Sequence, residues 1–327
     1  MLIDALRCAA GAAVLLLSQG CVASMDEAAG EDRADVGEAA LALKSYAKTQ
    51  YPIVLCHGMA GFKAMFGVVD YFGGVASTLR SGGAEVYATS VPQFDSTEAR
   101  GEALLAQVED IVARTGSGKV NLIGHSHGGL DVRYVAAVRP DLVASVTTIG
   151  SPHQGAELAS YLQENLRDGG FAQGALSFLA NSLGTVLSLL SGQTSAQDSI
   201  AAVRSLSAEG MREFNALYPA GLPEGRCGQG AAEENGVRFF SWSGTGIITS
   251  LLDPTDVTLG LISKLYSESN DGMVGRCSSH FGEVVRDDYG MNHLDEVNQL
   301  FGFINLSGPN PKSVFRAHAS RLKNLGL

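Results

Sequence analysis

Residues 121–134 read NLIGHSHGGLDVRY and constrain the fold more than any other part of the sequence. They set Ser126 between two nearby glycines, after a β-favouring run and before a segment with helical spacing of apolar residues. This is the pattern G-x-S-x-G in its strand, turn and helix context, where a side chain at either glycine would collide with the neighbouring strand or helix. The stretch predicts a strand that delivers a nucleophilic serine to the start of a helix. A chance glycine-rich turn, or a metal site of His125 and His127, explains that context less well.

The periodicity of the rest of the chain predicts an α/β fold. Two segments, residues 98–114 and 127–138, carry apolar residues at helical spacing. Strands that alternate with helices indicate a largely parallel sheet with both faces covered. Five short apolar runs have the length and composition of buried strands: residues 52–56, 85–89, 119–124, 145–150 and 237–244.

The uncharged, leucine-rich segment 171–192 has two interpretations. Its apolar residues recur at helical spacing, which is typical of a core helix. Its position after the first four predicted strands is equally compatible with a mobile lid that covers an active site with its apolar face.

Charge and the first residues bear on partners and location. The 23 basic and 34 acidic side chains give a net charge of −11, which opposes binding to nucleic acid. Residues 1–21 combine Arg7 with a short apolar run and predict an export signal, cleaved at small residues or processed before a lipidated Cys21. Residues 22–45 are acidic and are expected to be a flexible, solvated spacer, so the folded domain is expected to span 46–327.

An exported domain from 46 onward keeps three cysteines in an oxidising compartment. Cys227 and Cys277 both lie among glycine and serine residues, and we expect them to form a disulfide. Cys56 ends an apolar run and is expected to be a small buried hydrophobe rather than a reactive thiol.

Acyl transfer at Ser126 requires hydrogen-bond donors for the oxyanion. The tight strand-to-helix turn that presents such a serine is called a nucleophile elbow. In serine enzymes with this elbow, one donor is the N–H of the next residue, here His127, and another comes from the loop after an early strand. The text HGMAG follows the apolar run 52–56 and assigns Met59 as the second donor. His57 is expected to be a structural hydrogen-bonding residue.

The serine also requires a base and an orienting acid, in the chain order serine, acid, histidine. His293 lies in GMNHLDEVNQL, just before a predicted helix, and Asp271 lies in the turn text SNDGMVG. On spacing alone, rival acids remain: Asp287, Asp288 and Asp253.

Asp295 and Gln299 are four residues apart, so a helix would place both side-chain oxygens on one face. With a further carboxylate and backbone carbonyls, such oxygens suit calcium. A solvated helix start explains the same pair without a metal.

Taken together, the motifs resemble those of family I true lipases of Gram-negative bacteria, which are triacylglycerol lipases that need a dedicated foldase. The resemblance extends over nearly all of residues 46–327. It is carried by these segments: YPIVLCHGMAGF, VNLIGHSHGG with RYVAAVRPDL, LDPTD, NDGMVGRCSSH and MNHLDEVNQ. It implies an α/β-hydrolase fold, with a mostly parallel central sheet, helices on both faces and a helical lid at about 157–215 that includes 171–192.

The resemblance also implies roles for individual residues. Ser126 would be the nucleophile, Asp271 the acid and His293 the base, with Met59 and His127 as oxyanion donors. One structural Ca²⁺ would be held by the side chains of Asp253 and Asp295 and the carbonyls of Gln299 and Phe303. The pairing of Cys227 with Cys277 is implied as well.

The expected activity is cleavage of triacylglycerol or other fatty acyl esters at a lipid–water interface by an exported enzyme, with a lipase-specific foldase assisting during export. Cys21 and Cys56 depart from the family pattern, and Cys21 raises the alternative of anchoring to the outer membrane instead of secretion. Two other functions remain open on the sequence: a soluble esterase or thioesterase for short acyl chains, and an inactive hydrolase fold that serves as a surface lipoprotein or binding module.

Overall fold

The computed structural model describes residues 45–59, 64–65, 69–167, 199–250, 252–299, 302–305 and 307–327. The predicted signal 1–21, all but the last residue of the spacer 22–45, and the segment 171–192 lie outside these residues. Within the described ranges, no helix has both the length and the apolar character needed to cross a membrane.

A seven-stranded sheet forms the centre of the described domain, in the order β4-β1-β5-β6-β8-β7, with β9 paired to β8. All of its strand pairs are parallel except that of β7 with β8. A separate two-stranded antiparallel pair consists of β2 (Ala64–Met65) and β3 (Val69–Asp70). The strands of the large sheet are β1 (Ile53–Cys56), β4 (Val86–Ala88), β5 (Val120–His125), β6 (Val143–Ile149), β7 (Glu233–Glu234), β8 (Val237–Gly244) and β9 (Glu283–Tyr289).

The strand register brings three loops to one edge of the sheet. Cys56 at the end of β1 lies opposite Gly124 of β5, and Gly124 lies opposite Thr148 of β6. Because the three strands are parallel, the loops that follow them emerge side by side at their carboxyl ends, where ligands bind in open α/β sheets. These loops contain Met59, Ser126 and the residues after Ile149.

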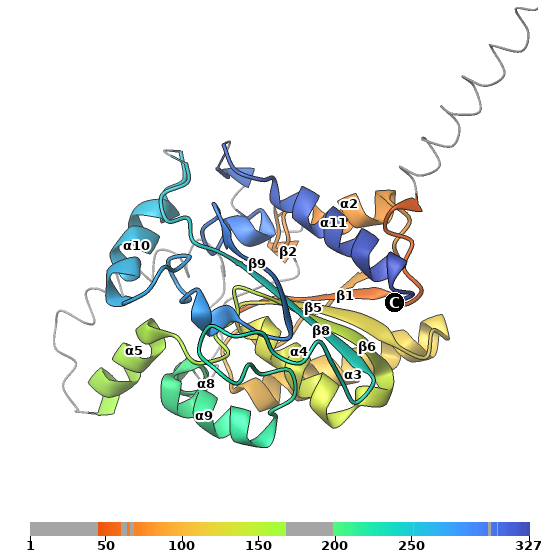
Figure 1. Cartoon of the computed structure of the whole chain (residues 1–327), viewed down its shortest axis with the longest axis horizontal. Coiled ribbons are helices and arrows are strands. Elements are labelled where there is room, and N and C mark those ends of the chain that lie inside the picture. Colours follow the sequence, from red (N-terminus) through yellow and green to blue (C-terminus); the bar gives the residue numbers. More distant parts are fainter. Residues whose placement is uncertain are drawn as a thin grey trace, which may run out of the picture. The chain divides into compact units, whose positions relative to one another are not determined.

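Alternating side chains build a core on each face of the sheet. Ile53 and Leu55 of β1 belong to one core, and Val54 and Cys56 belong to the other. Figure 1 shows α2 and α11 on one side of the sheet and α3 and α4 on the other. These helices are α2 (Val75–Ser81), α3 (Thr97–Thr115), α4 (His127–Val138) and α11 (Pro311–Asn324).

Four further helices lie toward one end of the sheet (Figure 1). They are α5 (Glu157–Arg167), α8 (Ser199–Leu206), α9 (Ala208–Leu217) and α10 (Thr255–Ile262). Leu158 and Leu162 of α5 share a small core with Ile262 of α10 and with Tyr266. The short 3₁₀ turns are η1 (Pro140–Leu142), η3 (Ser263–Leu265), η4 (Cys277–Ser279) and η5 (Asp295–Val297).

The predicted α/β architecture is confirmed. Each of the five predicted strands is present, and 237–244 matches β8 to the residue. The sequence analysis did not predict β9. Its sequence, EVVRDDY, is rich in charged residues and lacks an apolar run, because most of its side chains are only half-buried.

Candidate active site

Ser126 occupies the tight turn between β5 and α4. Its backbone has φ 56° and ψ −128°, in a region that side-chain-bearing residues seldom adopt. Such a conformation costs on the order of 1–3 kcal/mol and persists only where the surroundings enforce it. The Ser126 N–H donates to the carbonyl of Ile149 at 2.8 Å, which fixes the turn to β6.

The glycines beside Ser126 are required by close backbone contacts. A Cβ built on Gly124 would lie 2.2 Å from the carbonyl oxygen of Gly128 in α4. A Cβ built on Gly128 would lie 2.6 Å from the carbonyl oxygens of Cys56 and His57. The collisions predicted from the sequence, with the helix and with the neighbouring strand, are therefore confirmed.

Asp271 and His293 form a hydrogen-bonded pair. The Nδ1 atom of His293 lies 2.7 Å from Oδ2 of Asp271, and both side chains are buried. The other carboxylate oxygen, Oδ1, accepts from the backbone N–H groups of Met273 at 2.8 Å and Val274 at 2.7 Å. A carboxylate accepting at Nδ1 holds the proton there and leaves Nε2 free to act as a base.

The rival acids have other partners. Asp287 binds Arg276 and His280, and Asp288 binds Arg286. Asp253 accepts hydrogen bonds from the backbone and hydroxyl of Thr255. Among the described residues, Asp271 is the carboxylate bonded to the His293 imidazole.

The His293 ring lies beside the elbow. The ring of His125, the residue before Ser126, has its centroid 4.5 Å from that of His293. Ser126 also shares an apolar cavity with Met273, which follows Asp271 closely in the chain. Ser126, His293 and Asp271 thus lie at the same edge of the sheet.

The proposed oxyanion donors adjoin Ser126. A Cβ built on Gly58 would lie 2.8 Å from Cβ of Ser126, so the loop after β1 passes directly over this serine. Met59 lines the Ser126 cavity, and His127 follows Ser126 as the first residue of α4. The His127 ring, with Nε2 3.0 Å from the Thr97 hydroxyl, is buried, and burial lowers its pKa well below the usual value.

The cavity at Ser126 has apolar walls from the helices that border it. α5 contributes Leu158 and Leu162, α8 contributes Val203 and Leu206, and the remaining lining includes Pro152. This surrounding suits a hydrocarbon chain better than a polar group.

Other histidines and Cys56 have structural partners. His57 bonds the carbonyl of Gly58 through Nδ1 and accepts from the N–H of Val91 through Nε2, as a structural residue would. Cys56 is buried and forms no disulfide with any described cysteine, and burial raises the pKa of its thiol, which agrees with the predicted small hydrophobe. Oxidation or nucleophilic chemistry at this thiol is therefore disfavoured.

A group of buried carboxylates, Asp253, Asp256 and Asp295, lies near His293. Burial raises the pKa of Asp295 to about 6, and the negative charges of Asp256 and Asp253 add to the effect. In the described part of the chain no lysine or arginine pairs with these three acids. Both side-chain amide atoms of Gln299 are buried, and no described residue gives either of them a hydrogen-bond partner. Groups able to hold a metal are therefore present, and uncompensated carboxylates with an amide oxygen are the donors that a hard cation prefers.

The predicted helix through Asp295 and Gln299 is wrong. Only a 3₁₀ turn, η5, forms there, and Asn298 ends it with φ 57°. The side-chain amide of Asn298 donates to the carbonyl of Gly73, a contact 225 residues away in the chain that the local pattern could not reveal. Phe303, which follows this turn, has an exposed side chain.

Asp256 and Asn292 are site residues that sequence reasoning did not identify. Asp256 accepts from the N–H groups of Thr249 and Ser250, and it also accepts from the side-chain amide of Asn292 at 2.8 Å. Asp256 could have been identified from the sequence as the second carboxylate of the LDPTD segment, three residues after Asp253.

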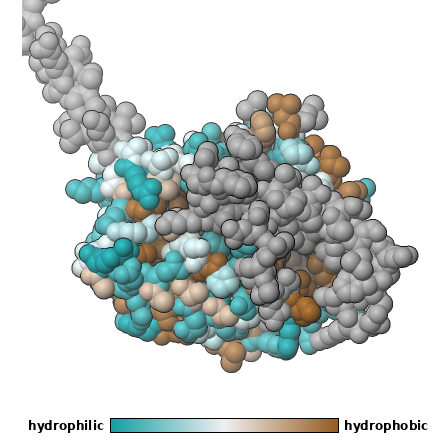
Figure 2. Space-filling view, turned by 180° about the vertical axis from the view of Figure 1, so that it is seen from behind, coloured by the Kyte–Doolittle hydropathy of each residue, from teal (hydrophilic) through white to brown (hydrophobic). Residues whose placement is uncertain are grey.

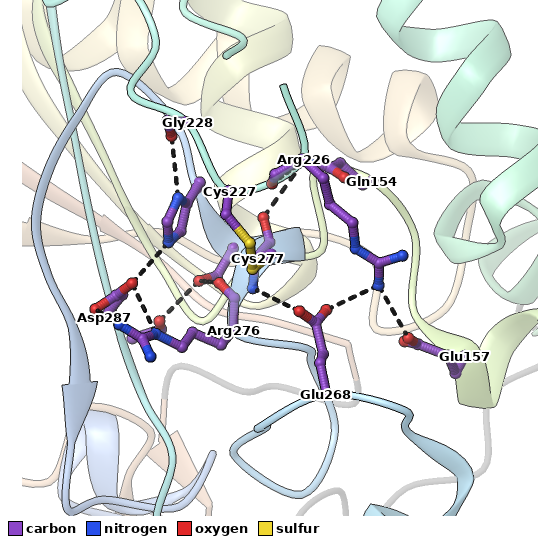
Figure 3. The surroundings of a disulfide bond; sticks show 12 residues. Gln154, Glu157, Arg226, Cys227, Gly228, Glu268, Arg276, Cys277 and Asp287 are labelled. Carbon is purple, nitrogen blue, oxygen red and sulfur yellow. Dashed lines mark hydrogen bonds and ion pairs between the residues drawn. A yellow bond between two sulfur atoms is a disulfide. The ribbon is translucent and has the colours of Figure 1, made fainter. Parts of the chain in front are cut away.

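The structure joins Cys227 to Cys277 in a disulfide with a Cα–Cα distance of 4.6 Å, as predicted. Figure 3 shows Glu268 beside it, accepting from the Cys277 N–H and pairing with Arg226. Arg226 also lies 3.7 Å from Glu157 at the start of α5. The disulfide therefore anchors the segment that follows Asp271 to the helix that lines the cavity.

Comparison with known proteins agrees with this geometry. A family model described as the alpha/beta hydrolase fold matches residues 51–287. A triacylglycerol lipase of Vibrio cholerae is 49% identical over 289 residues, covering 88% of this chain and 92% of the relative. One from Burkholderia plantarii is 41% identical, covering 88% of this chain and 90% of the relative.

Among solved structures, a Bacillus licheniformis lipase in its mature form aligns with a TM-score of 0.55 at 20% identity, covering 85% of this chain and 93% of that one. This likeness supports the fold alone. The family match over most of the chain and the identity to the curated relatives carry the assignment further: the chain belongs to the α/β-hydrolase family and, within it, to the triacylglycerol lipases of bacteria.

Proposed function

We propose that the protein is a triacylglycerol lipase that cleaves fatty acyl esters through a covalent intermediate on Ser126. The observation that carries the proposal is the strained turn at Ser126 beside a buried His293 that is bonded to Asp271 at 2.7 Å. A serine on such a turn, a histidine with its Nδ1 occupied and an orienting carboxylate are the parts of an acyl-transfer site.

In the proposed reaction, Nε2 of His293 takes the hydroxyl proton as Ser126 attacks the ester carbonyl. Asp271 keeps the ring oriented and stabilises the imidazolium. The negative carbonyl oxygen is held by the N–H groups of His127 and Met59. His293 then returns the proton to the departing alcohol, and water, activated by the same histidine, releases the fatty acid from the acyl-enzyme.

The surface near the cavity supports work at a lipid–water interface. The outer side of α10 and the loop before it expose four apolar side chains: Ile248 (67%), Leu252 (74%), Val257 (68%) and Leu261 (46%). Figure 2 shows hydrophobic atoms gathered at the upper right, the side on which α10 lies when Figure 1 is turned about its vertical axis. The inner side of α10 packs on α5, which lines the Ser126 cavity, so an apolar surface borders the site.

The nucleophile is tested by labelling with a fluorophosphonate and identifying the modified residue. We expect one label, on Ser126, and we expect Ser126→Ala to lose both the label and at least about 10⁴-fold of the ester hydrolysis. The unfolding midpoint of this variant should stay close to that of the parent, because the hydroxyl makes no packing contribution. Hydrolysis retained in Ser126→Ala would overturn the proposal.

The substrate class is tested by comparing emulsified long-chain triacylglycerols with dissolved short-chain esters. A lipase should turn over the emulsion faster, whereas a soluble esterase would prefer the dissolved ester.

We also propose that one structural Ca²⁺ is held by the side chains of Asp253 and Asp295, with the carbonyls of Gln299 and Phe303. The raised pKa of Asp295, beside Asp256 and Asp253, supports the two acidic ligands of this set. The ion would supply positive charge that ties the loop after His293 to the segment before α10. Chelation should lower the melting temperature, and Asp295→Asn should remove that response; a melting temperature that ignores both chelator and added Ca²⁺ would contradict the site.

Export is proposed from residues 1–21, with secretion or anchoring through a lipidated Cys21 as the two outcomes. Metabolic labelling with a fatty acid, compared between the parent and Cys21→Ser, separates them. A lipase-specific foldase is the proposed partner during export. Full recovery of activity by the denatured chain refolding alone would contradict that partner.

A further inference from the structure

A buried group of polar side chains beneath the site is not used by the reaction described above. It consists of Tyr71, His125 and Glu296, all of which are buried. They come from three separate parts of the chain: the segment before α2, the end of β5 and the turn η5. Buried polar groups are costly unless they bond one another, so their arrangement calls for a physical reason.

Tyr71 holds the oxyanion loop. Its hydroxyl oxygen accepts from the N–H of Gly58 at 3.0 Å, and the same oxygen lies 2.7 Å from Nδ1 of His125. Gly58 immediately precedes Met59, the proposed donor, and a side chain on Gly58 would collide with both the Tyr71 hydroxyl and Ser126. The position of the Met59 N–H is therefore coupled to where the Tyr71 hydroxyl stands.

Glu296 holds the loop that carries the base. One of its oxygens accepts from the N–H of Gly244, at the end of β8. The other oxygen, Oε2, lies 3.4 Å from Nε2 of His125, and among the described residues neither of these two buried atoms forms a hydrogen bond. Glu296 lies three residues after His293, so its placement bears on the loop from which the base projects.

His125 connects the two loops. It directly precedes Ser126, reaches Tyr71 with one ring nitrogen and faces Glu296 with the other, while its ring packs against that of His293. A neutral imidazole has one donor and one acceptor nitrogen. The Tyr71 hydroxyl accepts from the Gly58 N–H and can donate to Nδ1 of His125, which leaves the His125 Nε2–H beside the Oε2 atom of Glu296 at 3.4 Å.

We propose that Tyr71, His125 and Glu296 are positioning residues that hold the oxyanion donors and His293 in register on either side of Ser126. None of them touches the reacting atoms; each acts through Gly58, through the His293 ring or through the base loop. The proposal rests on the proposed function of Ser126 and His293. It assigns the first histidine of GHSHG to aligning the two halves of the site.

The test uses Tyr71→Phe, which removes the hydroxyl and leaves the ring. Without its acceptor the Gly58 N–H is freed and the oxyanion loop can shift, so kcat on a dissolved short-chain ester should fall about tenfold, the effect of one lost hydrogen bond. KM should stay within about twofold, because the acyl cavity is unchanged. The matched control is Tyr46→Phe, which removes a hydroxyl bonded to the carbonyl of Thr78 far from the site, and it should leave kcat unchanged.

The second arm tests coupling between the loops, with Ca²⁺ present throughout. Glu296→Gln keeps an acceptor for the Gly244 N–H and should retain most of kcat, whereas Glu296→Ala should lower it. Because both residues act through His125, the double variant Tyr71→Phe with Glu296→Ala should lose less than the product of the two separate losses.

Three results would overturn the inference. The first is an unchanged kcat in Tyr71→Phe. The second is a loss of kcat that is explained entirely by a smaller fraction of folded protein. The third is a loss of kcat in the double variant equal to the product of the two separate losses. Ser126→Ala run alongside separates the two levels of the argument. If it abolishes labelling while Tyr71→Phe has no effect, the proposed function stands and the positioning role alone fails.

Discussion

The two halves of the proposed site, the elbow half around Ser126 and the base half around the proposed base His293, are held in different ways. Ser126 stands between a strand and a helix, and its surroundings are backbone packed on backbone: Gly124 against α4 and Gly128 against β1. His293 stands in irregular chain, where polar side chains do the same work. Asn292, for example, accepts through its side-chain oxygen from the N–H groups of Leu294 and Asp295.

This difference teaches which substitutions each half tolerates. The elbow half depends on the absence of side chains, because regular structure already satisfies its backbone groups. The base half depends on the presence of specific side chains, because an irregular buried backbone needs hydrogen-bond partners at each turn. The following variants test that contrast.

The largest effect is expected from Asp271→Asn in the base half. The new amide would face Nδ1 of His293 with hydrogens and favour the tautomer that cannot accept the serine proton. We expect kcat to fall about 10³- to 10⁴-fold, while the Met273 and Val274 N–H groups keep an acceptor and the fold survives. The measurements are kcat on a dissolved ester and the rate of fluorophosphonate labelling.

Asp287→Asn is the control for this variant, since Asp287 bonds Arg276 and His280 instead. It should keep kcat within about twofold. Equal losses in the two variants would show that the base half does not single out Asp271.

Removing the disulfide tests how much of the base half depends on covalent anchoring. The double variant Cys227→Ser with Cys277→Ser frees a loop with a sequence separation of 50 residues. The chain-entropy model gives a loss of about 4 kcal/mol in the free energy of unfolding. Denaturant unfolding measures it, and kcat at low temperature should change little. A loss below about 1 kcal/mol would mean that the ion pairs of Arg226 and Glu268 suffice to hold this segment.

Gly124→Ala tests the elbow half. The added methyl would lie 2.2 Å from the carbonyl oxygen of Gly128, so β5 and α4 must separate, at a cost of about 3 kcal/mol in the free energy of unfolding. Gly225→Ala is the matched control, because a Cβ there meets nothing within 4 Å. If both variants unfold at the same denaturant concentration, backbone contact is not what holds the elbow.

The smallest effect is expected from acid. Burial, reinforced by the charge of Arg100, lowers the pKa of His57 from 6.5 to about 3 in the folded protein. The unfolded chain therefore binds a proton first as pH falls below 6.5, and stability is lost toward low pH by about 1.4 kcal/mol per pH unit from this residue. His57→Asn should reduce the slope of unfolding free energy between pH 6 and pH 5 by that amount. An unchanged slope would show that His57 does not carry this acid sensitivity.

The same contrast explains how much the sequence could predict. The elbow follows from local text, because strand, glycines, Ser126 and helix are contiguous, and β5 and α4 were predicted nearly to the residue. The pairing of His293 with Asp271 could be proposed from chain order, but rivals remained until the contacts of Asp287 and Asp288 were known.

What the sequence could not reveal lies in contacts between distant segments. The turn at Asn298 depends on a hydrogen bond to Gly73, so the spacing of residues 295–299 predicts a helix that does not form. Tyr71 and Glu296 look like ordinary core and surface residues in the text, and only the fold brings both to His125. The leucine-rich segment 171–192 falls outside the described residues, so its two interpretations stay predictions.

The positive φ of Ser126 has a consequence for how such a chain can change. Glycine at position 126 would relieve the conformational penalty, so thermodynamic stability favours losing the hydroxyl that the proposed reaction requires. The proposed reaction and the stability of the fold thus favour different residues at position 126. The surplus stability that lets serine remain there must come from the sheet and the helices around it. Mutations in that core are therefore indirect determinants of whether the enzyme can keep its proposed nucleophile.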